Sequence, residues 1–142
     1  MTGASGMGLA TAKIMGKSHY VIISGRTISK LQNAVNELQE AGIKVEAIAC
    51  DISDRASVEK LAARANEVGK VTAVIHAAGM SPHMGTGEMP LRVNALGAIY
   101  VNEVFSKVMG DKSCILDVSS ISAYLLLLML SRKKFIRKVI KM

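Results

Sequence analysis

Three glycines stand within six residues near the start of the chain, at a spacing that suits anion binding. Gly3 and Gly6 can adopt positive φ angles without steric cost, and the lack of a Cβ lets a phosphate approach the backbone N–H groups. A helix that begins near Gly8 would direct its free N–H groups and the positive end of its dipole at the same anion. This pattern is typical of dinucleotide binding. A disordered glycine-rich leader is the alternative interpretation.

Small or polar residues also stand where four predicted strands end. Ligands of an open parallel sheet bind outside the carboxyl ends of its strands, so this common placement predicts one shared site. Simpler explanations exist for single residues: Arg26 as a solvated turn residue, Asp51 as a helix cap, and Gly79 as a plain turn residue. The residues concerned are Gly25 with Arg26, Asp51, the run from His76 to Gly79, and Ser119 with Ser120.

The elements that position these residues are predicted to alternate between strands and helices. Ser29 is expected to cap the second helix, and Asp54 or Ser53 the third, while Pro90 suits the first turn of a long fourth helix. Such alternation predicts an α/β fold with a doubly wound parallel sheet. A β-branched apolar run predicts a strand at residues 19–24, and further strands are predicted at residues 45–50, 71–77 and 113–118. Helical spacing predicts helices at residues 9–16, 29–41, 55–68 and 90–109.

Five motifs in this order resemble the signatures of the short-chain dehydrogenase/reductase family. The resemblance covers roughly residues 2 to 124 and implies a Rossmann fold. It also implies NAD(P)-dependent oxidation of alcohols or reduction of carbonyls, with a small alcohol or carbonyl substrate. The motifs are Thr2-Gly3 with Gly6-Met7-Gly8, Cys50-Asp51, Ala77-Ala78-Gly79, Val93-Asn94-Ala95-Leu96-Gly97, and Val118-Ser119-Ser120.

The resemblance also assigns roles to individual residues of this chain. Asp51 and Ile52 would contact the adenine, and Arg26 would lie beside the adenosine ribose. Asn94 would hold a water of a proton relay, and Ser120 would hydrogen-bond the substrate oxygen. The pyrophosphate turn would comprise Gly3, Ser5, Gly6, Met7 and Gly8, and the cofactor would be lined by Ala77, Ala78 and Gly79.

Departures from the family pattern predict an incomplete enzyme. Only Ala4 and Ser5 separate the first two glycines, where three residues are usual, and no strand precedes the turn. None of the three tyrosines has the usual lysine four positions later. We therefore expect a truncated NAD(P)-binding domain over residues 1–124, lacking the first strand and the C-terminal part. The strands ending at Ser24 and Ala77 would then pair directly or leave a gap.

The residue that follows the strand ending at Ser24 bears on cofactor choice. An acid near this position binds the ribose 2′-hydroxyl of NAD. Here Gly25 is followed by Arg26, which can bind a 2′-phosphate through charge-assisted hydrogen bonds. The sequence therefore predicts that NADP(H) is favoured over NAD(H).

Charge and cysteine content limit the function classes. The net charge is +7, but the six basic residues after position 130 leave the body with 12 basic against 11 acidic residues, so nucleic-acid binding is not expected. Cys50 and Cys114 lie in apolar stretches without ligand-like spacing, which indicates reduced core thiols, no metal site and a cytoplasmic protein. The sequence leaves a homo-oligomer open.

The tail at residues 125–142 combines an apolar run with basic residues. The run at residues 123–130 is too short to span a bilayer, although the basic amphipathic segment after it is also typical of membrane-surface helices. We favour a broken or shifted reading frame over membrane attachment. The alternatives to a fragment of an oxidoreductase are a non-catalytic nucleotide-binding or interaction module and a membrane-surface remnant.

Overall fold

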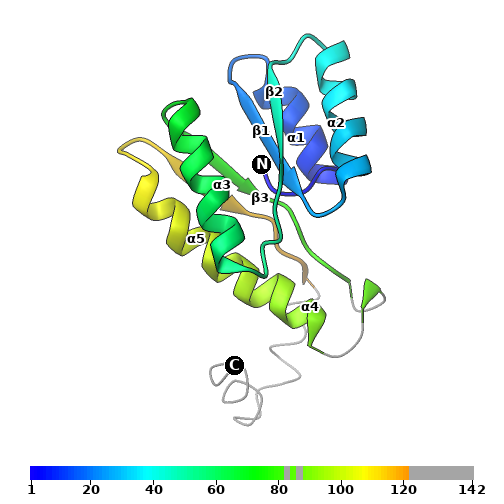
Figure 1. Ribbon diagram of the computed structural model, residues 1–142, viewed down its shortest axis with the longest axis vertical. Helices are drawn as coiled ribbons and strands as arrows, with labels where there is room; N and C mark the ends of the chain where they lie inside the picture. The colour runs from blue at the N-terminus through cyan, green and yellow to red at the C-terminus, as the bar shows by residue number, and fades with distance from the viewer. Residues whose placement is uncertain (82–83, 86–87, 122–142) are drawn as a thin grey trace.

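Parallel strands and helices alternate along the chain in this computed structural model, which describes residues 1–81, 84–85 and 88–121 (Figure 1). The first five elements are α1 (Gly6–Met15), β1 (Val21–Gly25), α2 (Ile28–Glu40), β2 (Val45–Ala49) and α3 (Arg55–Val68). The others are β3 (Ala73–His76), α4 (Met89–Leu91), the π-helix η2 (Arg92–Leu96), α5 (Gly97–Val108) and β4 (Cys114–Asp117).

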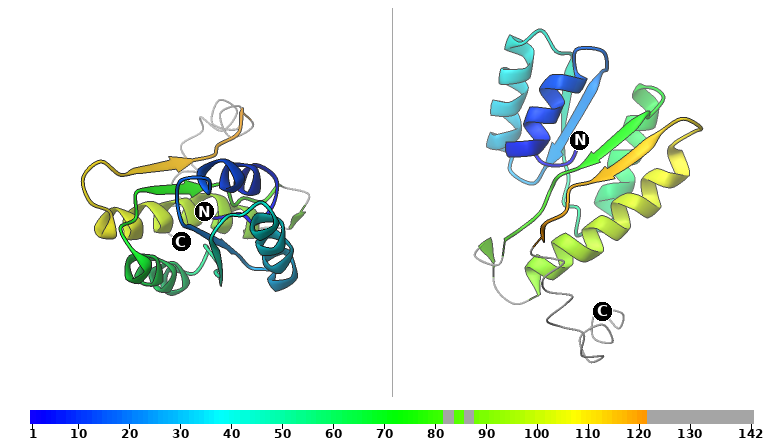
Figure 2. Two further views of the ribbon diagram at one scale, coloured as in Figure 1. Left: turned by 90° about the horizontal axis from the view of Figure 1, so that it is seen from above. Right: turned by 180° about the vertical axis from the view of Figure 1, so that it is seen from behind.

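The strands form two parallel pairs that lie next to each other. β1 pairs with β2 from Val21↔Val45 to Gly25↔Ala49. β3 pairs with β4 from Ala73↔Cys114 to His76↔Asp117. The amino end of the chain lies between the two pairs (Figure 2).

Helices cover both faces of β1, as the alternation of side chains along this strand requires. Val21 and Ile23 are buried in a cluster with residues of α1 and α2. Ile22 points the other way and packs against a second cluster, built largely from α3, β3 and α5. The predicted doubly wound arrangement is confirmed for the described residues.

Thr2 joins the two strand pairs in the place where a central strand would lie. It forms parallel bridges to Ser24 of β1 and to His76 of β3. The predicted gap between β1 and β3 is therefore present toward their amino ends but is closed at their carboxyl ends. The closing hydrogen bonds run from Thr2 N to Ile75 O (2.9 Å), Ala77 N to Thr2 O (3.1 Å), Gly3 N to Ser24 O (2.9 Å) and Ser24 N to Met1 O (2.8 Å).

Several local predictions are corrected by the structure. The N-cap of α2 is Thr27 rather than Ser29, whereas Asp54 caps α3 by accepting a hydrogen bond from the Ala56 N–H. The long helix expected from residue 90 is divided into α4, η2 and α5. Cys50 is buried as expected, but Cys114 is exposed because β4 has an uncovered face.

The α-amino group of Met1 is buried between β1 and β3, where it donates a hydrogen bond to Ile22 O (2.8 Å). Burial lowers its pKa from 8.0 to about 6. The folded state thus favours the neutral amine, and protonation favours the unfolded state. The neutral amine makes its full contribution to the free energy of unfolding well above pH 8, and this contribution is lost as the pH falls through 6.

We expect the free energy of unfolding of the chain to drop by about 2 kcal/mol between pH 8 and pH 6, since each pKa unit corresponds to about 1.4 kcal/mol and the amine is half-titrated at each limit. Urea titrations at a series of pH values measure this drop. N-terminal acetylation removes the charge but keeps an N–H for Ile22 O, so it should flatten the profile above pH 6.5. An unchanged profile after acetylation would assign the effect to another group, such as His76.

No helix in the described residues is long and apolar enough to cross a membrane. The proposed boundary at residue 124 and the tail at residues 125–142 lie outside the described residues.

Candidate functional site

The glycine-rich turn has the backbone geometry that anion binding requires. Gly3 and Gly6 have φ angles of +100° and +54°. Helix α1 begins at Gly6, and its N-cap residue, Ser5, makes no side-chain capping bond. The first N–H groups of α1 therefore have no cap from Ser5, and Met7 in the same turn is exposed. The turn forms although it is one residue shorter than usual.

Close backbone packing explains the glycines at positions 3 and 8. A Cβ on Gly8 would lie 2.3 Å from the backbone oxygen of Gly3, closer than any real side chain can approach. A Cβ on Gly3 would lie 3.3 Å from the backbone of Ala77. The first turn of α1 is thus pressed against the loop that leads into it. A Cβ on Gly6 would meet nothing within 4 Å, which leaves that side of the turn open.

A cavity of about 180 Å³ lies at the carboxyl ends of the strands and collects many of the predicted cofactor residues. The glycine turn contributes Gly3 and Ser5, and the loop after β1 contributes Arg26. Predicted residues outside the described lining of this cavity are Gly6, Met7, Gly8, Asp51, Asn94 and Ser120. The remaining predicted residues that line it are Ile52, Ala77, Ala78 and Gly79.

Two cations stand at this cavity. Arg26 and Lys30 both line it, and neither forms an ion pair with another described residue. The sequence prediction missed Lys30, although its position four residues after Arg26, on the first turn of α2, carried the signal. Two cations without acidic partners favour a phosphate over a bare hydroxyl.

Thr2 and His76 support the backbone at Ala78, which lines the cavity. The Ala78 N–H donates to Thr2 Oγ1 (3.3 Å), and the same hydroxyl forms a hydrogen bond with His76 Nδ1 (2.7 Å). Burial lowers the pKa of His76, with Asp117 opposing the shift. The sequence prediction included His76 only within the run from His76 to Gly79 and gave Thr2 no bracing role.

Asp51 lies in a local turn ahead of α3. Its Oδ1 accepts hydrogen bonds from the Ser53 N–H (2.9 Å) and from the Ser53 hydroxyl (2.7 Å). The Asp51 N–H donates to Ser57 Oγ (3.1 Å). Ile52 beside it is buried and reaches the cavity. The structure therefore places Ile52, rather than the Asp51 carboxylate, at the cavity.

Asn94 fixes the loop that follows Ala78 and Gly79. Its side chain accepts from the Met80 N–H (2.8 Å) and donates to Met80 O (2.7 Å). It belongs to the π-helix η2, and π-helical turns are frequent at functional sites. Ser120 is exposed and follows β4 by three residues. It comes from the same rim of the strands but lies outside the described lining of the cavity.

The comparison with known families decides the identity of this arrangement. A family model described as short chain dehydrogenase matches residues 1–126. The chain belongs to the short-chain dehydrogenase/reductase family. This confirms the resemblance drawn from the five motifs.

Two curated relatives of this short-chain dehydrogenase match most of the chain. The short-chain dehydrogenase/reductase bsc3 of Alternaria brassicicola is 32% identical over 124 residues, which is 87% of this chain and 45% of the relative. The human mitochondrial dehydrogenase/reductase SDR family member 2 is 30% identical over 136 residues, which is 87% of this chain and 49% of the relative. The chain thus spans about half the length of these relatives.

Solved structures of the family have the same fold. An actinorhodin polyketide ketoreductase variant with NADPH superimposes with a TM-score of 0.76 at 26% identity, over 87% of this chain and 52% of that one. A short-chain dehydrogenase/reductase from Burkholderia phymatum in complex with NAD gives 0.73 at 25% identity, over 85% and 48%. The predicted α/β, Rossmann-like fold is confirmed, and structures with either dinucleotide are among the neighbours.

Proposed function

We propose that this chain is the nucleotide-binding part of an oxidoreductase that acts on alcohols or carbonyl compounds, and that it favours NADP(H) over NAD(H). The observation that carries the proposal is the turn between Gly3 and Gly8. Its positive φ angles, the close packing of α1 and the helix N-terminus without a Ser5 cap fit a pyrophosphate.

Each part of a bound dinucleotide would meet a different group of described residues. The backbone N–H groups of the glycine turn would hold the pyrophosphate, and Arg26 with Lys30 would hold a ribose 2′-phosphate. Ile52 would offer an apolar contact to the adenine. The backbone from Ala77 to Gly79, braced by Thr2 and Asn94, would line the path toward the nicotinamide. The cofactor supplies hydride transfer when bound.

The catalytic assignments rest on family membership and position. Ser120 lies on the rim from which a hydroxyl can hydrogen-bond a substrate oxygen. Asn94 orders the Met80 loop, so its side chain is already engaged by backbone groups. No tyrosine of the 142 residues is followed four positions later by a lysine. We therefore propose that the chain binds the nucleotide without completing the reaction.

Cofactor preference tests the proposal. Charge-assisted hydrogen bonds contribute about 1.5–3 kcal/mol each, so we expect NADPH to bind roughly ten- to a hundredfold more tightly than NADH. Arg26→Ala should remove most of this preference, and adding Lys30→Ala should remove the rest. Calorimetric titration of both nucleotides measures the ratio of the two affinities.

Lys60→Ala is the matched control, because it removes one cation from α3, away from the cavity. It should leave the ratio of affinities unchanged. Equal affinities in the unmodified chain would contradict the proposal.

A further inference from the structure

Gly97, the first residue of α5, has no conformational need to be a glycine. Its φ and ψ angles of −58° and −44° are those of an ordinary right-handed helix. Glycine is a poorer helix former than alanine, so the helix alone does not explain its presence. The reason for a glycine at this position therefore lies in what packs against it.

The residue that packs against Gly97 is Ile52, from the loop after β2. Ile52 lines the cavity of about 180 Å³ that Arg26 and Lys30 also line, which we call the nucleotide cavity. A Cβ on Gly97 would lie 2.9 Å from Ile52 Cδ1, 3.0 Å from Ile52 Cγ1 and 3.4 Å from Ile52 O. Gly97 and Ile52 are both buried. The missing side chain of Gly97 thus provides the space in which the end of the Ile52 side chain lies.

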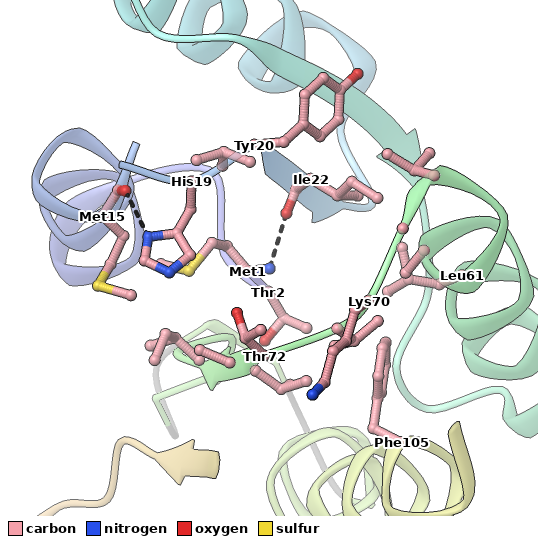
Figure 3. Close-up of a pocket in the computed structure, with 18 of the residues that line it drawn as sticks. Met1, Thr2, Met15, His19, Tyr20, Ile22, Leu61, Lys70, Thr72 and Phe105 are labelled. Carbon is pink, nitrogen blue, oxygen red and sulfur yellow. Dashed lines mark hydrogen bonds between the residues drawn. The ribbon is translucent and has the colours of Figure 1, made fainter. Parts of the chain in front are cut away.

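The backbone on both sides of this contact is held in place. The loop that carries Ile52 is tied to α3, because the Asp51 N–H donates to Ser57 Oγ (3.1 Å). Helix α5 is tied to α3 as well, since Phe105 and Leu61 belong to one buried cluster. Both of these side chains also line the gap between β1 and β3 that a central strand of this fold would fill (Figure 3). A new Cβ on the first turn of α5 would therefore be accommodated by the Ile52 side chain.

The Ile52 side chain is confined on one side and borders open space on the other. It belongs to a buried cluster with Val58 and Val101, whose exposed fractions are 0%. Because protein interiors are close-packed, this side offers no room for a displaced side chain. The other side of Ile52 borders the nucleotide cavity. A displaced Ile52 side chain would thus enter the cavity at the place proposed for the adenine.

We propose that Gly97 is a positioning residue of the nucleotide site, which keeps the adenine end of the cavity open by leaving room for Ile52 against α5. This role rests on the proposed nucleotide-binding function of the chain. Gly97 is not among the described residues that line the cavity, so it acts through Ile52. Helix α5 thereby affects the binding of the base, although the groups proposed to hold the phosphates lie on α1, α2 and the loops before them.

Gly97→Ala is expected to weaken the binding of NADPH and of NADH by the same factor, about tenfold or more. The factor is the same because Arg26 and Lys30, which would hold the 2′-phosphate, are unchanged. Calorimetric titration of the 142-residue chain and of the variant measures both affinities. Gly110→Ala is the control, because within 4 Å a Cβ there would meet only Lys70 Cε, at 3.7 Å. This control should leave both affinities unchanged.

Ile52→Ala distinguishes a displaced side chain from a general loss of structure. In the unmodified chain, this change removes an apolar contact to the adenine and should weaken NADPH binding severalfold. In the Gly97→Ala variant, it removes the obstructing side chain and should strengthen NADPH binding severalfold. The effect of one substitution thus changes sign with the residue at position 97, which a merely destabilised fold would not produce.

Thermal unfolding of all four chains without nucleotide shows which of them are folded. If Gly97→Ala alone does not fold, the double variant should still fold and should bind NADPH as Ile52→Ala does. A double variant that fails to fold, when Ile52→Ala folds, would overturn the role of Gly97. So would a Gly97→Ala variant that binds NADPH as tightly as the unmodified chain, or an Ile52→Ala change that weakens binding in both backgrounds. If the unmodified chain binds neither dinucleotide, the proposed function fails, and the role of Gly97 fails with it.

Discussion

Gly8→Ala is expected to weaken NADPH binding by at least tenfold and to destabilise the fold by about 1–3 kcal/mol, the usual range for overpacking. The new Cβ would lie 2.3 Å from Gly3 O, and both groups belong to backbone that cannot rotate away. The first turn of α1 must then move from the loop that leads into it. Because Thr2 and Gly3 also join β1 to β3, the displacement reaches the sheet as well as the cavity.

Gly110→Ala is the matched control for this change. A Cβ there would meet only Lys70 Cε, at the ordinary contact distance of 3.7 Å, and Gly110 lies away from the nucleotide cavity. Thermal unfolding and NADPH titration of both variants give the two effects separately. If Gly8→Ala binds NADPH as the unmodified chain does, the glycine turn does not hold the pyrophosphate.

The 142-residue chain is expected to show carbonyl reduction well below the ordinary enzyme range of about 1–10³ s⁻¹. A general acid at the right distance contributes about 10²–10⁴-fold, and no tyrosine–lysine pair at the family spacing is present to supply it. Ser120 and Asn94 could still orient a substrate or a loop, but neither is a proton donor near neutral pH. The loss in rate should therefore occur without a loss of nucleotide binding.

Absorbance of NADPH, followed against a panel of ketones and aldehydes, measures this rate. The same samples are titrated with NADPH, so that absent turnover is not confused with absent binding. Turnover near 1 s⁻¹ that disappears in Ser120→Ala would show that another group donates the proton. Turnover that survives Ser120→Ala would point to a contaminating reductase.

Most of the fold could be predicted from the sequence because short apolar runs, such as Val21-Ile22-Ile23, alternate with segments whose apolar residues have helical spacing. Residues 45–49 and the helix at residues 55–68 match their predicted positions within a residue. The division of the helix after Pro90 was not predictable, because Asn94 leaves regular helical geometry to bond the Met80 backbone, which is a tertiary contact. Propensity carries no signal for such a contact.

The candidate site was predictable where backbone conformation alone selects the residue. Gly3 has a positive φ angle, and Gly8 lies too close to the Gly3 backbone oxygen for any Cβ. Both positions require glycine, so both can be recognised in the sequence. The Thr2–His76 hydrogen bond joins residues 74 positions apart, so its pairing becomes visible only in the folded chain. Arg26 could be predicted from its place after a strand, and Lys30 from its place one helical turn later on α2.

The buried apolar side chains form two clusters, and this division affects how the chain loses its structure. One cluster joins α1, β1 and α2, and the other is built largely from α3, β3 and α5, with Ile22 and Ile48 packed against it. The backbone hydrogen bonds between β1 and β3 are confined to Met1 to Gly3 in the described residues, and each contributes about 0.5–1.5 kcal/mol. We therefore expect the two halves to part before either melts. Acidification, which charges the Met1 amine at this junction, would favour the parted form first.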